Sequence, residues 1–96
     1  MTYGTDKYSQ LKVVTFKESS FIKNISWDSN TESLLVGFNS GTTWVYYNVP
    51  ENIYNDLLKA SSVGTYFNKV IRDNYPSQRI NYKLNESRSV QKEEKA

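Results

Sequence analysis

The stretch that most constrains the fold is residues 41–50, with the sequence GTTWVYYNVP. Its β-branched and aromatic residues are typical of a pleated strand. The glycine at its start suits a tight turn, because glycine tolerates a positive φ. Pro50 has no N–H to donate to a β-ladder, so the strand is predicted to end near Val49.

Alternation along this strand gives it two aromatic faces. Trp44 and Tyr46 share one side, and Tyr47 lies on the other. We expect one face to cover the core and the other to offer rings to a partner. The plainer interpretation, in which every ring serves packing, stays open.

The period of the apolar residues changes at Pro50. Residues 20–28 and 34–39 read as two earlier strands separated by turn-forming residues 29–32. Beyond Pro50 the apolar residues recur at helical spacing in two runs, which are separated by residues 60–64 and ended by Pro76. The sequence predicts an α+β fold, a three-stranded antiparallel meander packed by two helices, with residues 11–16 and 80–84 available as a fourth and fifth strand.

The chain divides into three parts around this core. Residues 1–19 are predicted to form an N-terminal arm or an edge strand, and residues 20–76 a single domain. Residues 77–96 are predicted to form an extension, with one further strand and then a charged, flexible tail.

Composition excludes several kinds of chemistry. The chain has 96 residues, with no cysteine and no histidine. Disulfides, thiolate or imidazole catalysis and ordinary zinc sites are therefore excluded. The 10 acidic residues are scattered, so the sequence predicts no metal, no cofactor and no enzyme activity.

No apolar run approaches the roughly 20 residues of a membrane span, and no signal peptide is evident. We expect a cytoplasmic protein, in the host cytoplasm if the chain is phage-encoded. The net charge of +2 is mild, which favours a short ligand over a long polyanion.

The ordered pattern between residues 20 and 75 resembles the KTSC domain, a module found alone in bacterial and phage proteins and fused to some lysyl-tRNA synthetases. The matching features are Ser20, Ile22, Ile25, Leu34, Val36, Phe38, Gly41, Trp44, Tyr46, Val49, Pro50, Tyr54, Ala60, Ser62, Gly64, Phe67, Asn68, Ile71 and Tyr75. The family's central motif is Tyr-x-Tyr, and here Trp44 takes the first place. The synthetase fusions imply RNA binding.

A ligand site is predicted around the second helix. Its first turn has free N–H groups that can hold an anion, although Ser62 could equally cap the helix. Asn68 and Arg72 share a face, and an arginine fork beside an anion and a ring would recognise a phosphate together with a base. The candidate ligand-binding residues are Trp44, Tyr46, Tyr47, Ser61, Ser62, Gly64, Asn68, Arg72, Tyr75 and Arg79.

The sequence is consistent with three functions. The first is non-enzymatic binding of a small nucleotide, in its narrowest form a phage-type sponge that sequesters a cyclic nucleotide of bacterial immunity. The second is RNA binding. The third is protein interaction, with residues 11–16 or 80–84 extending a partner's sheet. The aromatic content and the unassigned flanking strands also predict a homo-oligomer.

Overall fold

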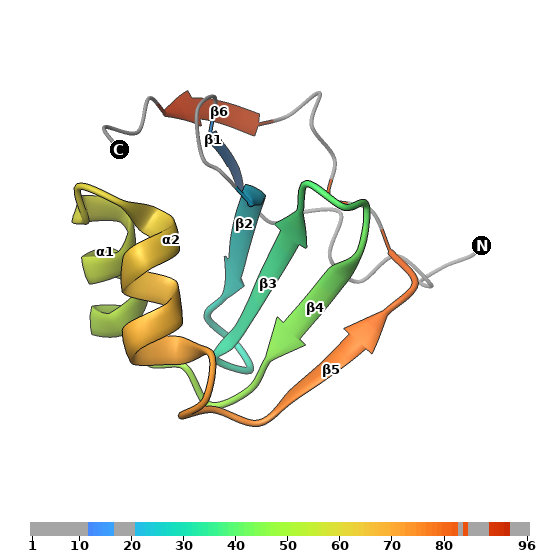
Figure 1. The fold of residues 1–96 in the computed structure, drawn as a ribbon. Helices are drawn as coiled ribbons and strands as arrows, with labels where there is room; N and C mark the ends of the chain where they lie inside the picture. Colours follow the sequence, from blue (N-terminus) through green and yellow to red (C-terminus); the bar gives the residue numbers. More distant parts are fainter. Residues whose placement is uncertain (1–11, 17–20, 83, 85–88, 93–96) are drawn as a thin grey trace.

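A six-stranded sheet organises the molecule (Figure 1). The computed structural model describes residues 12–16, 21–82, 84 and 89–92. The strands are β1 (Val13–Phe16), β2 (Ile22–Asp28), β3 (Ser33–Phe38), β4 (Thr43–Tyr46), β5 (Ser77–Ile80) and β6 (Ser89–Lys92). The helices are α1 (Glu51–Lys59) and α2 (Val63–Tyr66), and α2 continues directly into a π-helical turn, η1 (Phe67–Ile71).

The strand order is β5-β4-β3-β2-β1-β6. All neighbours are antiparallel except β1 and β6, which are parallel. The fold is α+β, and the expected meander is β2, β3 and β4. Three strands from the flanking segments widen it, β5 beside β4 at one edge and β1 and β6 at the other.

The C-terminal segment differs from its prediction. β5 begins directly after Pro76, because the Pro76 carbonyl accepts from the Tyr47 N–H at 2.9 Å and starts the pairing with β4. The extra strand is therefore earlier than residues 80–84. β6 lies in a segment predicted to be flexible, and its backbone pairs with β1 from Val13 opposite Ser89 to Phe16 opposite Lys92.

The aromatic strand is shorter than predicted. β4 ends at Tyr46, and Asn48 has a φ of 65°. This left-handed conformation breaks the extended backbone before the predicted end at Val49. The Val49 N–H instead donates to the Glu32 carbonyl at 2.8 Å, which ties the segment to the β2–β3 turn.

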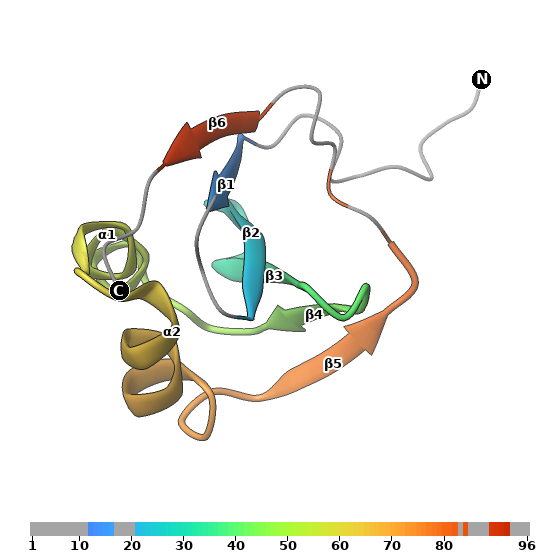
Figure 2. The same cartoon turned by 45° about the horizontal axis from the view of Figure 1, so that its top comes forward.

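The main core lies between one face of the sheet and the helices. Helix residues Leu57, Val63, Phe67 and Ile71 are almost fully buried there. They pack against buried sheet residues Val14, Phe16, Ile22, Ile25, Leu34, Val36 and Tyr46. Figures 1 and 2 show α1 and α2 together on this side of the curled sheet, with β5 and β6 at its two ends.

The opposite face of the sheet is also apolar and covered. Val13, Leu35 and Val45 are buried there with Leu84. Tyr47, Ile80 and Tyr82 pack around them. Both faces being buried explains the uninterrupted apolar run in β3, which is typical of doubly covered strands. Both faces of β4 and its continuation therefore take part in packing, and the rings of Trp44 and Tyr47 are only half-buried.

One of the two reasons for predicting a homo-oligomer, the unassigned flanking strands, no longer applies. β1, β5 and β6, the flanking strands that motivate it, are paired within one chain. In the described residues, no helix is long and apolar enough to cross a membrane.

Candidate functional site

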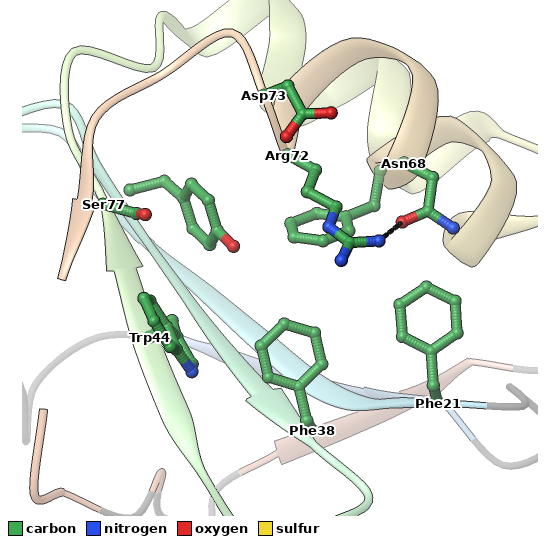
Figure 3. Close-up of a pocket in the computed structure, with 9 residues that line it drawn as sticks. Phe21, Phe38, Trp44, Asn68, Arg72, Asp73 and Ser77 are labelled. Atoms are coloured by element: carbon green, nitrogen blue, oxygen red, sulfur yellow. Dashed lines mark hydrogen bonds between the residues drawn. The ribbon is translucent and has the colours of Figure 1, made fainter. Parts of the chain in front are cut away.

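A pocket of about 400 Å³ opens between the helix-side face of the sheet and the end of the second helix (Figure 3). Its apolar wall consists of Phe21, Phe38, Trp44, Tyr46 and Phe67. Its polar side chains are Asn68, Arg72, Asp73 and Ser77. A ring-lined cavity with a few polar groups is typical of a small-ligand site.

The aromatic wall is held by ring contacts. Phe21 and Phe38 are stacked, with centroids 6.2 Å apart and an interplanar angle of 9°. Phe67, only 1% exposed, meets Phe21, Phe38 and Tyr46 edge-on at 6.3, 5.7 and 5.2 Å. Such edge-to-face pairs favour one arrangement of the rings. Phe67 therefore fixes the floor, while the half-buried Phe21, Phe38 and Trp44 form the accessible wall.

Strand register brings these rings to one face. Trp44 pairs directly with Val36, and directly opposed residues point to the same side. Phe38 is two residues beyond Val36 in β3, so it also points to that side. Phe38 and Trp44 consequently face the helices from neighbouring strands.

The π turn directs the polar residues to the pocket. The Arg72 N–H donates to the Phe67 carbonyl at 2.9 Å, a bond from residue i+5 to residue i. Arg72 therefore lies one turn beyond Phe67, and the turn itself is of a kind often found at functional sites. The Arg72 Nη1 donates to the Asn68 Oδ1 at 3.4 Å, and Figure 3 shows this pair above the Phe21 and Phe38 rings.

The hydroxyl of Tyr46 is un-ionised at neutral pH. Burial raises its pKa, because the phenolate is poorly solvated there. The charge of Arg72 opposes this rise and that of Asp73 adds to it. Tyr46 can therefore both donate and accept a hydrogen bond inside the pocket.

The structure brings together four predicted site residues. Trp44, Tyr46, Asn68 and Arg72 all line the pocket. Tyr47 does not, because it points to the opposite face, where its hydroxyl donates to the Gln78 Oε1 at 3.0 Å.

The start of the second helix is separate from the pocket. Ser62 is the N-cap, and its Oγ accepts from the Thr65 N–H at 3.3 Å. Gly64 lies under Phe21, since a Cβ there would come within 2.7 Å of that ring. Ser61 is exposed. None of these residues lines the pocket.

Arg72 lies nine residues after Val63, which is roughly 14 Å along a helix. The predicted site that joins an anion at the helix start to Arg72 is therefore wrong as a single arrangement. The capping interpretation of Ser62 is the one the structure contains.

The remaining predicted residues have other places. Tyr75 packs against the main core. Arg79 is exposed on β5 and pairs with Trp44 across the strands, so it lies on the pocket side of the sheet but outside the pocket.

The rest of the lining was not predicted from the sequence: Phe21, Phe38, Phe67, Asp73 and Ser77. Alternation in β3 could have placed Phe38 beside Trp44. No pattern marks Asp73 or Ser77, because their positions depend on how the chain leaves η1. Within the described residues, no group of three or more acidic side chains could hold a metal ion.

These features define a small α+β domain whose sheet and second helix enclose an aromatic pocket with an arginine at its rim. The family model of the KTSC domain matches residues 18–75. The chain therefore belongs to the KTSC family. That range contains every pocket residue except Ser77, whereas β1, β5 and β6 lie outside it.

A solved structure and several curated proteins are similar to this chain. The crystal structure of a KTSC domain protein from Yersinia pestis has 30% identity and a TM-score of 0.63, and covers 68% of this chain and 92% of its own. A protein from Tsukamurella paurometabola is 34% identical over 58 residues, 60% of this chain and 87% of that protein.

Lysine–tRNA ligases are also among the curated relatives. The ligase of Nostoc punctiforme is 34% identical over 80 residues, 79% of this chain. The ligase of Trichormus variabilis matches to the same extent. The chain spans only 14% of the length of these ligases.

Proposed function

We propose that the protein is a non-enzymatic binding module whose pocket holds a nucleotide, either free or as an unpaired residue of RNA. The observation that carries the proposal is the pocket itself, where an accessible aromatic wall faces a guanidinium. Rings of this kind stack on nucleobases, and arginine suits a phosphate because its planar fork donates two parallel hydrogen bonds.

The size of the pocket supports a small ligand. A volume of about 400 Å³ lies in the range of about 300–1,000 Å³ that is usual for small-molecule sites. Arg72 is the only cation among its lining residues, which is enough for one phosphate group.

Binding can be read from Trp44 fluorescence. The chain has 2 tryptophans, and the other, Trp27, is stacked on Tyr54 at 5.5 Å and does not line the pocket. In a Trp27→Phe background the remaining signal comes from the pocket wall. We expect ribonucleoside monophosphates, cyclic di- or trinucleotides, or short RNA oligomers to quench it and to raise the melting temperature.

Arg72→Ala should lower the affinity about tenfold or more, because a charged hydrogen bond to phosphate is lost. Lys69→Ala is the matched control. It removes a charge from the same turn, from an exposed residue that does not line the pocket. If no nucleotide and no RNA oligomer changes the fluorescence or the melting temperature, the proposal fails.

RNA is the second candidate, favoured by the lysine–tRNA ligase relatives and by the place of Arg79. An RNA strand that leaves the pocket past Trp44 would meet Arg79 on β5. RNA binding predicts a steep salt dependence and a loss of affinity in Arg79→Gln. A free nucleotide confined to the pocket predicts no effect of that substitution.

The sponge function is a narrower form of the first proposal. It requires a cyclic di- or trinucleotide to bind more tightly than any monophosphate and to be released chemically unchanged. Chromatography of the ligand after denaturing the complex tests both requirements, and a hydrolysed product would show catalysis instead.

A further inference from the structure

The carboxylate of Asp73 is an unused hydrogen-bond acceptor at the pocket. Asp73 lines the cavity and follows Arg72, the residue that caps the end of η1. Within residues 12–16, 21–82 and 84, its carboxylate has no hydrogen-bond or ion-pair partner. The adjacent Arg72 donates to Asn68 instead. A ligand can therefore engage Asp73 without breaking a contact inside the protein.

The polar side of the pocket carries both donors and acceptors. Figure 3 shows the Arg72 guanidinium, with Asn68 beside it, directed toward the Phe21 and Phe38 rings, whereas the Asp73 carboxylate lies above Arg72 and farther from the rings in this view. A guanidinium such as that of Arg72 offers only donors, and a carboxylate offers only acceptors. A ligand bound between the aromatic wall and the helix end would thus find a cation and a carboxylate in the same pocket lining.

A carboxylate selects among nucleobases by the donors on their edges. Its two oxygens accept two parallel N–H bonds. Guanine presents the ring N1–H and the exocyclic amino group side by side. On the corresponding edges of adenine, cytosine and uracil, each donor has an acceptor beside it. That acceptor would lie opposite a carboxylate oxygen, and two acceptors repel each other.

We propose that Asp73 makes the pocket selective for guanine, accepting from the N1–H and the amino group of the base while Arg72 holds the phosphate. This inference rests on the proposed function, because it specifies which nucleotide the pocket takes. It also orients the ligand, with the edge of the base at Asp73 and the phosphate at Arg72.

The test compares GMP, IMP and AMP by calorimetric titration at one ionic strength. IMP has the N1–H of guanine but lacks the amino group, and AMP lacks both donors. We expect GMP to bind about tenfold more tightly than IMP, and AMP to bind more weakly than IMP, since a bidentate contact discriminates bases to about this extent. Asp73→Asn should bring the three affinities close together by weakening GMP.

Asp56→Asn is the matched control, because Asp56 is exposed on α1 and does not line the pocket. It should keep the GMP preference of the wild type. Asp73→Glu keeps the charge but moves the acceptors by one methylene, and it should weaken GMP while circular dichroism confirms the fold of both Asp73 variants.

The outcomes separate the two proposals. If none of the three nucleotides binds, and no cyclic di- or trinucleotide and no RNA oligomer binds either, the proposed function fails. If nucleotides bind without a preference for GMP, or if the preference survives Asp73→Asn in folded protein, guanine selection by Asp73 is wrong and the nucleotide pocket stands.

Discussion

At the scale of single residues, buried tyrosine hydroxyls link the core to pH. Burial raises the pKa of the Tyr54 hydroxyl above its ordinary value of 10.0. Burial also raises the pKa of Tyr46, with Arg72 opposing and Asp73 assisting the rise. In both cases the folded state keeps a proton that the unfolded chain releases at lower pH.

The sign of the pH effect follows from this difference. Above the ordinary tyrosine pKa the unfolded state binds fewer protons than the folded state, so the free energy of unfolding decreases as pH rises. The stabilisation is complete below about pH 10 and is lost as the pH passes through the raised folded-state values. We expect alkaline unfolding that becomes shallower in the double variant Tyr46→Phe, Tyr54→Phe.

Urea unfolding at several pH values between about 8 and 11.5 measures this slope. Phenylalanine keeps the ring contacts of Tyr46 with Phe67 and of Tyr54 with Trp27. Each variant at neutral pH serves as its own control for packing. An alkaline slope equal to that of the wild type would contradict the prediction.

At the scale of elements, the second helix begins at a side-chain cap. Ser62 accepts from the Thr65 N–H, so Ser62→Ala should lower the free energy of unfolding by about 1 kcal/mol. Ser61→Ala, at the exposed neighbour, should change it by less than about 0.5 kcal/mol. Chemical denaturation measures both variants.

Nucleotide affinity provides the second measurement on the same variants. Because neither serine lines the pocket, both variants should bind as the wild type does. A loss of affinity in folded Ser62→Ala would show that the helix start takes part in binding after all.

The helix end shows what the sequence could and could not predict. Apolar spacing predicts that Phe67 and Ile71 are buried, and both are. An α-helical turn and a π turn leave nearly the same apolar stripe, so the i+5 bond of Arg72 has no sequence signal. The placement of Asp73 and Ser77 beside the rings depends on that turn and was therefore not predictable.

The strands also show which features the sequence could predict and which it could not. Alternation predicts the meander and the shared face of Trp44 and Tyr46, and the structure contains both. The sequence of β6 shows no alternation of apolar and polar residues that would predict a strand. β6 pairs with β1 through backbone hydrogen bonds, which require no particular side chains. No sequence pattern predicted the left-handed conformation of Asn48, which ends β4 early.

At the scale of the whole molecule, the sheet is stable only if both of its faces are covered. The helices cover one face. On the opposite face, among the described residues, the segment after β5 packs against the sheet, and its Leu84 is only 7% exposed. This segment lies outside the KTSC match at residues 18–75. The C-terminal extension is therefore expected to complete the core and not merely to follow it.

Two truncations separate this covering role from the contribution of β6. A chain ending at Ile80 loses both Leu84 and β6 and uncovers Val13, Leu35 and Val45, whereas a chain ending at Leu84 loses β6 but keeps the cover. Burying one leucine contributes about 1.5–3 kcal/mol, so the shorter chain should melt about 10 °C below the longer one. It should also bind a hydrophobic dye and self-associate in sedimentation, because an exposed apolar sheet face favours association. Equal melting temperatures and equal dye binding in the two truncated chains would contradict the covering role of Tyr82 and Leu84.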